Sequence, residues 1–216
     1  MLMEKIILVD KNDKELGFEE KIAGHQNGGK LHRAFSIFVF NLKGEMLIQK
    51  RAKEKYHSSL LWTNACCSHP RPNEPLEAAA HRRLKEEMGF DCDLKEKFSF
   101  VYKVDFEDGI SENEFDHVFF GKSDVEPKPD PKEAADWEWI DVEELKKDIK
   151  ENPEKYSYWL KISLNKVLKH AIQSKQNCLR YYPPLAELRG EKKMSYNPQR
   201  IEKKWQRVWE KTGIYQ

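Results

Sequence analysis

Short runs rich in apolar, β-branched and aromatic residues recur along the chain, and turn-forming or charged residues separate them, which predicts strands. The runs occupy residues 5–9, 34–40, 46–51, 60–67, 98–106, 114–122 and 135–141. A polar turn at 10–14 and a Gly-rich loop at 24–29 follow the first run. The segment Asn41 to Gly44 predicts a hairpin turn between the second run and the third.

Three segments have the pattern of helices. In residues 75–88, Pro75 suits the first turn, alanines fill the middle, and Gly89 provides a left-handed stop. Further helices are predicted at 142–152 and 158–170. Strands before and after one long helix predict an α/β (α+β) fold, in which a mixed β-sheet is sandwiched between helices.

The composition changes near Lys175. A loop-like segment, QNCLRYYPPL, is followed by a charged helical segment at 198–211. We therefore predict one domain at 1–175, followed at 176–216 by a linker and a charged helical tail. The tail forms a C-terminal helical extension and is interpreted as a possible fusion remnant.

Charge and composition exclude several functions. Lys plus Arg (38) nearly balances Asp plus Glu (37), so no overall basic field favours nucleic acid as a partner of the main domain. No apolar run approaches the roughly 20 residues of a membrane helix, and the N-terminus lacks a signal-peptide pattern. The sequence therefore predicts a cytoplasmic protein whose four cysteines are free thiols.

The charged residues of the helix at 75–88 allow two interpretations. They can form a solvated face of ion pairs, since Arg82 precedes Glu86 by four residues. Alternatively, Glu86 and Glu87, with Glu74 at the helix entry, hold Mg²⁺ against a diphosphate. The stretch from Ser68 to Phe90 resembles the Nudix box. It matches that pattern at Glu74, Arg82, Leu84, Glu86, Glu87 and Gly89, and departs from it at Ser68, Arg83 and Phe90.

Histidines and acidic residues provide a second set of candidate ligands. Glu112 and Glu114 lie two residues apart, so an extended segment puts both carboxylates on one face. Together with His25, His32 and His69, they suit a six-coordinate or near-octahedral site for Mg²⁺, Mn²⁺ or Zn²⁺.

Four segments together, KIAGHQNGGKLHRAFS, WTNACCSHP, the altered Nudix box and SENEF, resemble the type I isopentenyl-diphosphate isomerases of the Nudix superfamily over residues 4–172. The resemblance implies a metal-assisted 1,3-proton transfer through a carbocation. It implies catalytic roles for Cys67, Glu114 and Tyr102, and a structural role for Cys66. The implied metal ligands are His25, His32, His69, Glu112 and Glu114, with Glu87 at a second Mg²⁺ that the diphosphate helps to coordinate. The implied substrate-binding residues are Lys21, Arg51, Lys55, Arg83 and Trp159.

Two other functions stay open at this point. One is a Nudix diphosphatase, which would release phosphate and would leave Cys67, His25 and His32 without roles. The other is a non-catalytic regulatory module associated with a tRNA synthetase. Residues 194–213 resemble the N-terminal segment of leucyl-tRNA synthetases, although none of the ATP-binding motifs of those enzymes is present. The partner of this tail is unknown.

Overall fold

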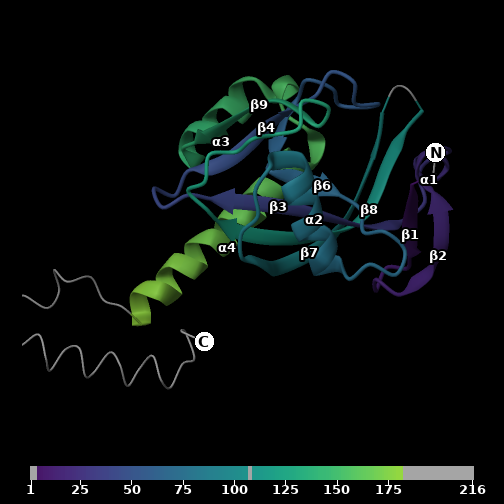
Figure 1. Ribbon diagram of the computed structural model, residues 1–216, viewed down its shortest axis with the longest axis horizontal. Helices are drawn as coiled ribbons and strands as arrows, with labels where there is room; N and C mark the ends of the chain where they lie inside the picture. The colour runs from purple at the N-terminus through teal and green to yellow at the C-terminus, as the bar shows by residue number, and fades with distance from the viewer. Residues whose placement is uncertain (1–3, 107–108, 182–216) are drawn as a thin grey trace, which may run out of the picture. The chain divides into compact units, whose positions relative to one another are not determined.

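The computed structural model describes residues 4–106 and 109–181, with side chains as far as residue 171. These residues form a mixed β-sheet with helices packed on it (Figure 1). The strands are β1 Lys5–Val9, β2 Glu15–Glu20, β3 His32–Phe40, β4 Met46–Arg51, β5 Trp62–Asn64, β6 Cys66–Ser68, β7 Leu94–Asp105, β8 Ser111–Lys122 and β9 Ala134–Ile140. The helices are α1 Lys21–His25, α2 Leu76–Met88, α3 Val142–Glu151 and α4 Tyr158–Tyr181, with a 3₁₀ turn at Pro153–Lys155. This architecture confirms the predicted fold class.

Strand β3 is the centre of the sheet. It pairs antiparallel with β1, β4 and β6, and parallel with β8 along its whole length, from His32 beside Glu114 to Phe40 beside Lys122. Strand β7 pairs with β8, and β4 pairs with β5 and β9. The parallel register puts two predicted metal ligands on neighbouring strands.

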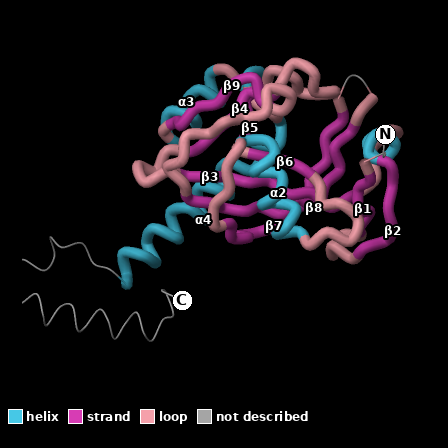
Figure 2. The backbone as a smooth tube through the Cα atoms, viewed as in Figure 1, coloured by secondary structure: helices cyan, strands magenta, loops and turns pink. Residues whose placement is uncertain are grey.

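Helix α2 covers one face of the sheet, where it lies against β3, β6 and β7 (Figure 2). Its buried side chains join a hydrophobic core with alternate residues of β3, because successive side chains of a strand point to opposite faces. The core on this side includes Phe35, Ile37, Val39, Ala79, Ala80, Leu84 and Met88. The helix ends at Gly89, whose φ of 74° is the left-handed stop that the sequence predicts.

The residues predicted as one strand at 60–67 form two short strands instead. Strand β5 pairs with β4, β6 pairs with β3, and the chain bends at Ala65 between them. The amide of Asn64 fixes this bend because it donates hydrogen bonds to the carbonyls of Ile37 (3.0 Å) and Cys66 (2.9 Å). An alternation of apolar residues cannot reveal such a change of partner.

Two other elements differ from the prediction near the N-terminus. The segment Glu15–Glu20 forms the edge strand β2, which has no clear apolar alternation. Helix α1 reaches His25 inside the predicted Gly-rich loop, and the Glu20 side chain caps it by accepting a hydrogen bond from the Ala23 amide (2.9 Å).

At its C-terminal end, α4 continues to Tyr181, past the predicted end at 170 and through the first part of the predicted loop. The sequence has no Pro or Gly between Tyr158 and Tyr181, so nothing in this stretch removes a helical hydrogen bond. Contacts divide the chain into two compact units, Met1–His170 and Ala171–Gln216. The domain boundary after 175 stays a prediction, and the tail helix at 198–211 lies outside the described residues.

Candidate functional site

The five predicted ligands of the metal site come together from four separate segments. They stand at the end of α1, at the start of β3, just after β6 and in β8, and one ligand atom of each lies within 4.8 Å of all the others. All five side chains are buried: His25, His32, His69, Glu112 and Glu114. The five residues that the sequence analysis grouped therefore form one compact cluster that could hold a metal ion.

Backbone contacts set the orientation of two of these imidazoles. The Nδ1 atoms of His25 and His32 lie 2.6 Å from the Lys21 carbonyl and 2.8 Å from the Lys30 carbonyl. Because a carbonyl only accepts, both Nδ1 atoms carry hydrogen, and in the neutral ring the Nε2 lone pair then faces the cluster. The Nε2 atoms of His32 and His69 are 3.1 Å apart. The His69 Nε2 atom also lies 3.1 Å from the Oε1 atom of Glu114, and ring nitrogens and carboxylate oxygens gathered this closely fit a divalent metal.

Most of the charges of the cluster point the same way. Burial acts to lower the pKa of His25, but the neighbouring Glu112 carboxylate outweighs it and raises that value. Burial lowers the pKa of His69 to about 4, which keeps that imidazole neutral at neutral pH. Burial also acts to raise the pKa of Glu112 and of Glu114, but the surrounding imidazoles outweigh it and lower both values. Among the described residues, the Nε2 atom of His25 and the Oε2 atom of Glu112 have no hydrogen-bond partner, although they are only 3.1 Å apart. Neutral imidazoles and anionic carboxylates are the states that bind metals.

The two adjacent cysteines point to opposite faces of β6. Cys66 pairs with Ile37 and joins the core beneath α2, whereas Cys67 pairs with Ser36 and lines the pocket. Burial raises the pKa of the Cys67 thiol, and the nearby Asp116 carboxylate raises it further. The thiol donates to the Asn64 Oδ1 atom at 3.1 Å and lies 3.4 Å from the Ser36 hydroxyl.

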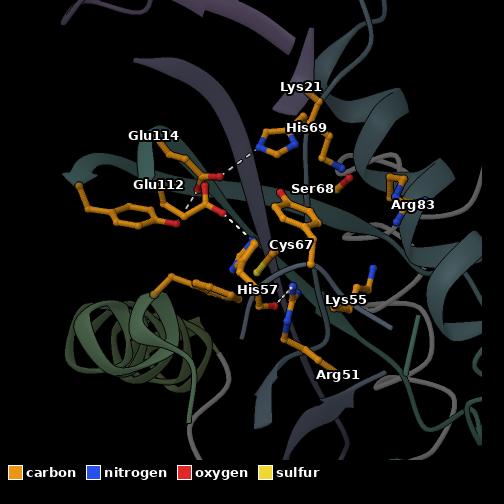
Figure 3. A pocket seen from close by; sticks show the side chains of 13 residues that line it. Lys21, Arg51, Lys55, His57, Cys67, Ser68, His69, Arg83, Glu112 and Glu114 are labelled. Atoms are coloured by element: carbon orange, nitrogen blue, oxygen red, sulfur yellow. Dashed lines mark hydrogen bonds and ion pairs between the residues drawn. The ribbon is translucent and has the colours of Figure 1, made fainter. Parts of the chain in front are cut away.

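Glu114 connects the metal cluster to the pocket. Its Oε1 atom lies 3.1 Å from the His69 Nε2 atom, and its Oε2 atom accepts a hydrogen bond from the Tyr102 hydroxyl at 2.7 Å. Burial raises the pKa of Tyr102 well above its ordinary value, so the phenol keeps its proton. Figure 3 shows Glu112 and Glu114 at one end of the pocket, with Cys67 between them and the cationic end.

Four predicted cations line the pocket: Lys21, Arg51, Lys55 and Arg83. Three of them have carboxylate partners. Lys21 pairs with Glu4 at 3.0 Å, Lys55 pairs with Glu133, and Arg83 lies 3.1 Å from Glu133. The Arg51 guanidinium instead donates to the carbonyls of His57 and Ser58, each at 3.1 Å. Its cationic carbon lies 5.2 Å from the ring centre of Trp159. This end of the pocket provides donors for an anionic group.

The three acidic residues of the Nudix-like segment have two kinds of surroundings, and the Mg²⁺ interpretation of them stays a prediction. Glu74 and Glu86 pair with Arg82 near the surface, with nitrogen–oxygen distances between 2.6 and 3.0 Å. Glu87 is buried, where its carboxylate accepts hydrogen bonds from Gln49 (3.0 Å) and Arg83 (2.6 Å). The ion-pair interpretation therefore describes the outer face of the helix, and Glu87 faces inward.

Several residues around the pocket have no sequence signal of their own. His57 and Tyr56 lie in a loop without a regular pattern, and Glu133 precedes β9 in a Pro-rich stretch. Asp116 continues the alternation of Glu112 and Glu114 along β8, and that alternation could have identified it as a residue of the same face.

Comparisons with known proteins agree with this geometry. The sequence profile of the NUDIX domain matches residues 30–160. The chain is 54% identical over 165 residues (76% of this chain, 87% of the relative) to isopentenyl-diphosphate Delta-isomerase 2 of Aromatoleum aromaticum. It is 40% identical over 167 residues to an isopentenyl-diphosphate Delta-isomerase of Pectobacterium atrosepticum, covering 77% of this chain and 93% of that one.

Among solved structures, DR0079 of Deinococcus radiodurans has a similar fold. The TM-score is 0.65 at 19% identity, covering 76% of this chain and 98% of that one. A MutT protein of Methanosarcina mazei follows, with a TM-score of 0.52 at 17% identity, covering 65% of this chain and 95% of that one. These likenesses concern the fold alone. No helix in the described part of the chain is long and apolar enough to cross a membrane.

Proposed function

The chain belongs to the type I isopentenyl-diphosphate Delta-isomerases of the Nudix superfamily, and on that premise we propose how its pocket interconverts isopentenyl and dimethylallyl diphosphate. The observation that carries the proposal is the position of Cys67 and of the Glu114–Tyr102 pair in one pocket that also has a cationic end. The thiol and the carboxyl–phenol pair are the two groups that exchange protons with the substrate.

The reaction requires two proton transfers on neighbouring parts of the alkene. One proton adds to the terminal carbon of the double bond, which leaves a tertiary carbocation, and another leaves the carbon on the diphosphate side. A new double bond forms there, so atoms and charge balance. Cys67 and Glu114 act on the two sides of the double bond and exchange roles in the reverse direction. Tyr102 relays a proton to or from the Glu114 Oε2 atom.

His25, His32, His69, Glu112 and Glu114 would hold one Mn²⁺, Mg²⁺ or Zn²⁺ ion. When bound, this ion fixes the orientation of Glu114 and increases its acidity. Glu87 would ligate a second Mg²⁺ that arrives with the diphosphate. Lys21, Arg51, Lys55 and Arg83 hold the diphosphate by charge-assisted hydrogen bonds, and the substrate replaces Glu133 as the partner of Lys55 and Arg83.

Trp159 lies at the part of the pocket that receives the hydrocarbon. Trp159 is 4% exposed, and the Arg51 guanidinium and a T-shaped contact with the His57 ring hold its side chain in place. An aromatic face stabilises a desolvated cation by about 2 kcal/mol. We propose that Trp159 excludes water and stabilises the carbocation, since water would trap it.

Two assays on one sample separate this function from its rivals. The purified protein is incubated in Mg²⁺ with isopentenyl diphosphate, while dimethylallyl diphosphate and released phosphate are both measured. We expect isomerisation without phosphate release. We also propose that the enzyme acts in the cytoplasm. Faster release of phosphate than isomerisation would favour a diphosphatase, and no product at all would favour a non-catalytic module.

A further inference from the structure

His57 makes a contact with the metal cluster that belongs to no role assigned so far. It lies in the loop between β4 and β5 and is 8% exposed. Its Nε2 atom is 2.9 Å from the Oε1 atom of Glu112, as the dashed line in Figure 3 marks. Its Nδ1 atom lies 3.2 Å from the Ser58 hydroxyl, which can donate to it. In that arrangement the Nε2 atom carries the hydrogen and donates to Glu112.

The two carboxylate oxygens of Glu112 therefore have different neighbours. Oε1 accepts from His57, whereas Oε2 faces the Nε2 atom of His25 at 3.1 Å without a hydrogen bond. A carboxylate at the end of a flexible side chain has several rotamers, and a donor on one oxygen selects among them. The free oxygen then points to the place that the imidazole lone pairs face.

The surroundings of His57 hold its ring in position. The ring stacks on Phe106 with centroids 5.2 Å apart, and it meets Trp159 edge-on at 5.8 Å. The backbone carbonyl of His57 accepts a hydrogen bond from Arg51, the cation that also lies over Trp159. His57 therefore contacts Glu112 of the His/Glu cluster, the aromatic ring of Trp159 and, through its carbonyl, Arg51 at the cationic end of the pocket.

We propose that His57 is a positioning residue of the metal centre, which holds Glu112 by its Oε1 atom so that the Oε2 atom ligates the ion. This inference rests on the proposed metal site. His57 is not itself a ligand, because its Nε2 atom is already used by Glu112 and lies outside the compact set of five ligand atoms. Loss of such a supporting hydrogen bond typically weakens metal binding about 10- to 100-fold.

A pair of amide substitutions tests the hydrogen bond itself. In His57→Gln the amide nitrogen reaches the position of the histidine Nε2 atom and can donate to Glu112. In His57→Asn the amide is one carbon shorter and reaches only the position of Nδ1. Each variant is stripped of metal, checked for folding by thermal unfolding, and titrated with Co²⁺ or Mn²⁺ in competition with a chelator of known affinity.

We expect His57→Asn to bind the ion about 10- to 100-fold more weakly than the wild type, and His57→Gln to recover most of the loss. The Co²⁺ absorption spectrum of His57→Gln should match that of the wild type, because the ligand set is unchanged. Wild-type affinity in His57→Asn overturns the proposal. So does an altered spectrum with equal losses in both variants, which would make His57 a ligand.

The variant His25→Ala separates this inference from the metal site on which it depends. If His25→Ala loses the ion while His57→Asn keeps it, the site stands and only the positioning role of His57 fails. If His25→Ala binds the ion like the wild type, the five-residue site itself is wrong. If His57→Asn does not fold without metal, His57→Phe replaces it in the same titration, because Phe keeps a ring against Phe106 but cannot donate to Glu112.

Discussion

The side of strand β6 on which a cysteine lies determines what its thiol can do. Cys66 points into the core beneath α2, where no substrate reaches, and Cys67 points into the pocket beside Ser36. We expect Cys67→Ala to abolish turnover while substrate binding and folding are retained, because one of the two proton-exchanging groups is gone. Cys66→Ala should have a mild effect. Steady-state rates and a binding titration on both variants test this, and the opposite result would show that the roles of the pair are reversed.

Ser36 contacts the Cys67 thiol and the buried Asp116 carboxylate at the same time. Its hydroxyl donates to Asp116 at 2.8 Å and lies 3.4 Å from the Cys67 sulfur. We expect Ser36→Ala to reduce kcat more than it raises KM, because the thiol loses a neighbour that orients it. The variant also removes the Ser36 hydroxyl from the Asp116 Oδ2 atom, and the Oδ1 atom already has no hydrogen-bond partner among the described residues. The loss should cost about 1–3 kcal/mol of unfolding free energy.

The matched control is Ser36→Thr, which keeps a hydroxyl on a strand position that suits a β-branched residue. It should recover most of kcat and of the stability lost in Ser36→Ala, as measured by kinetics and urea unfolding. An unchanged kcat in stably folded Ser36→Ala would contradict an orienting role.

At the scale of single residues, the members of the His/Glu cluster could be predicted because short motifs contain them. His69 follows Cys67 by two residues, and Glu112 and Glu114 alternate on one strand. The partners of these groups could not be predicted in the same way. Ser36 and Asp116 are 80 residues apart, and only the parallel register of β3 and β8 brings them together.

Within helix α2, two neighbouring arginines have different surroundings. Arg83 lies at the pocket, where it donates to Glu86, Glu87 and Glu133, whereas Arg82 pairs with Glu74 and Glu86 on the outer face. Because Arg83 provides a planar donor pair for phosphate oxygens, we expect Arg83→Glu to raise KM at least as much as it lowers kcat. The lost contact is worth roughly 2–5 kcal/mol.

Two further variants serve as controls for Arg83→Glu. Arg83→Glu adds a fourth carboxylate beside Glu86, Glu87 and Glu133, so Arg83→Gln removes the cation without that repulsion and should raise KM as well. Arg82→Gln is the matched control and should leave KM nearly unchanged. Steady-state kinetics with both products monitored would show the difference, and an unchanged KM in Arg83→Gln would remove Arg83 from the diphosphate site.

The elements that the sequence predicted best are those whose stability is local. Helix α2 has its start, its alanines and its Gly89 stop within 15 residues, and the structure confirms it. Strands β5 and β6 were predicted as one because their division depends on a hydrogen bond from the Asn64 side chain to the Ile37 carbonyl, 27 residues away, and on pairing with two different strands. The edge strand β2 is held by pairing with β1, which its own composition does not indicate.

The metal cluster joins parts of the molecule that are far apart in sequence. Its ligands come from α1, β3, the segment after β6 and β8, so an ion would bind the folded chain and not the unfolded one. At an ion concentration about 100 times Kd, such binding adds about 2.7 kcal/mol of stability. We expect exhaustive chelation to remove activity and to lower Tm by roughly 5–10 °C.

Mn²⁺ or Mg²⁺ should restore both properties, as measured by thermal unfolding and by the isomerase assay. The matched control is His25→Ala, whose Tm should not respond to the ion. Full activity in a demonstrably metal-free sample would contradict the proposed mechanism.

The last prediction concerns how much of the chain the reaction needs. Among the residues that the structure describes, those that line the pocket lie between Lys21 and Trp159, inside the compact unit Met1–His170. Removal of residues 182–216 should therefore leave the rate of isomerisation nearly unchanged.

A second truncation after Lys175 cuts into α4 and tests the predicted boundary, because the described helix continues to Tyr181. Kinetics and thermal unfolding of both truncations distinguish the outcomes: a large loss of rate in a folded chain ending at Tyr181 would mean that the tail helps to form the site. A loss of stability confined to the shorter chain would instead place the end of the domain between residues 176 and 181, because the last turns of α4 would then be part of it.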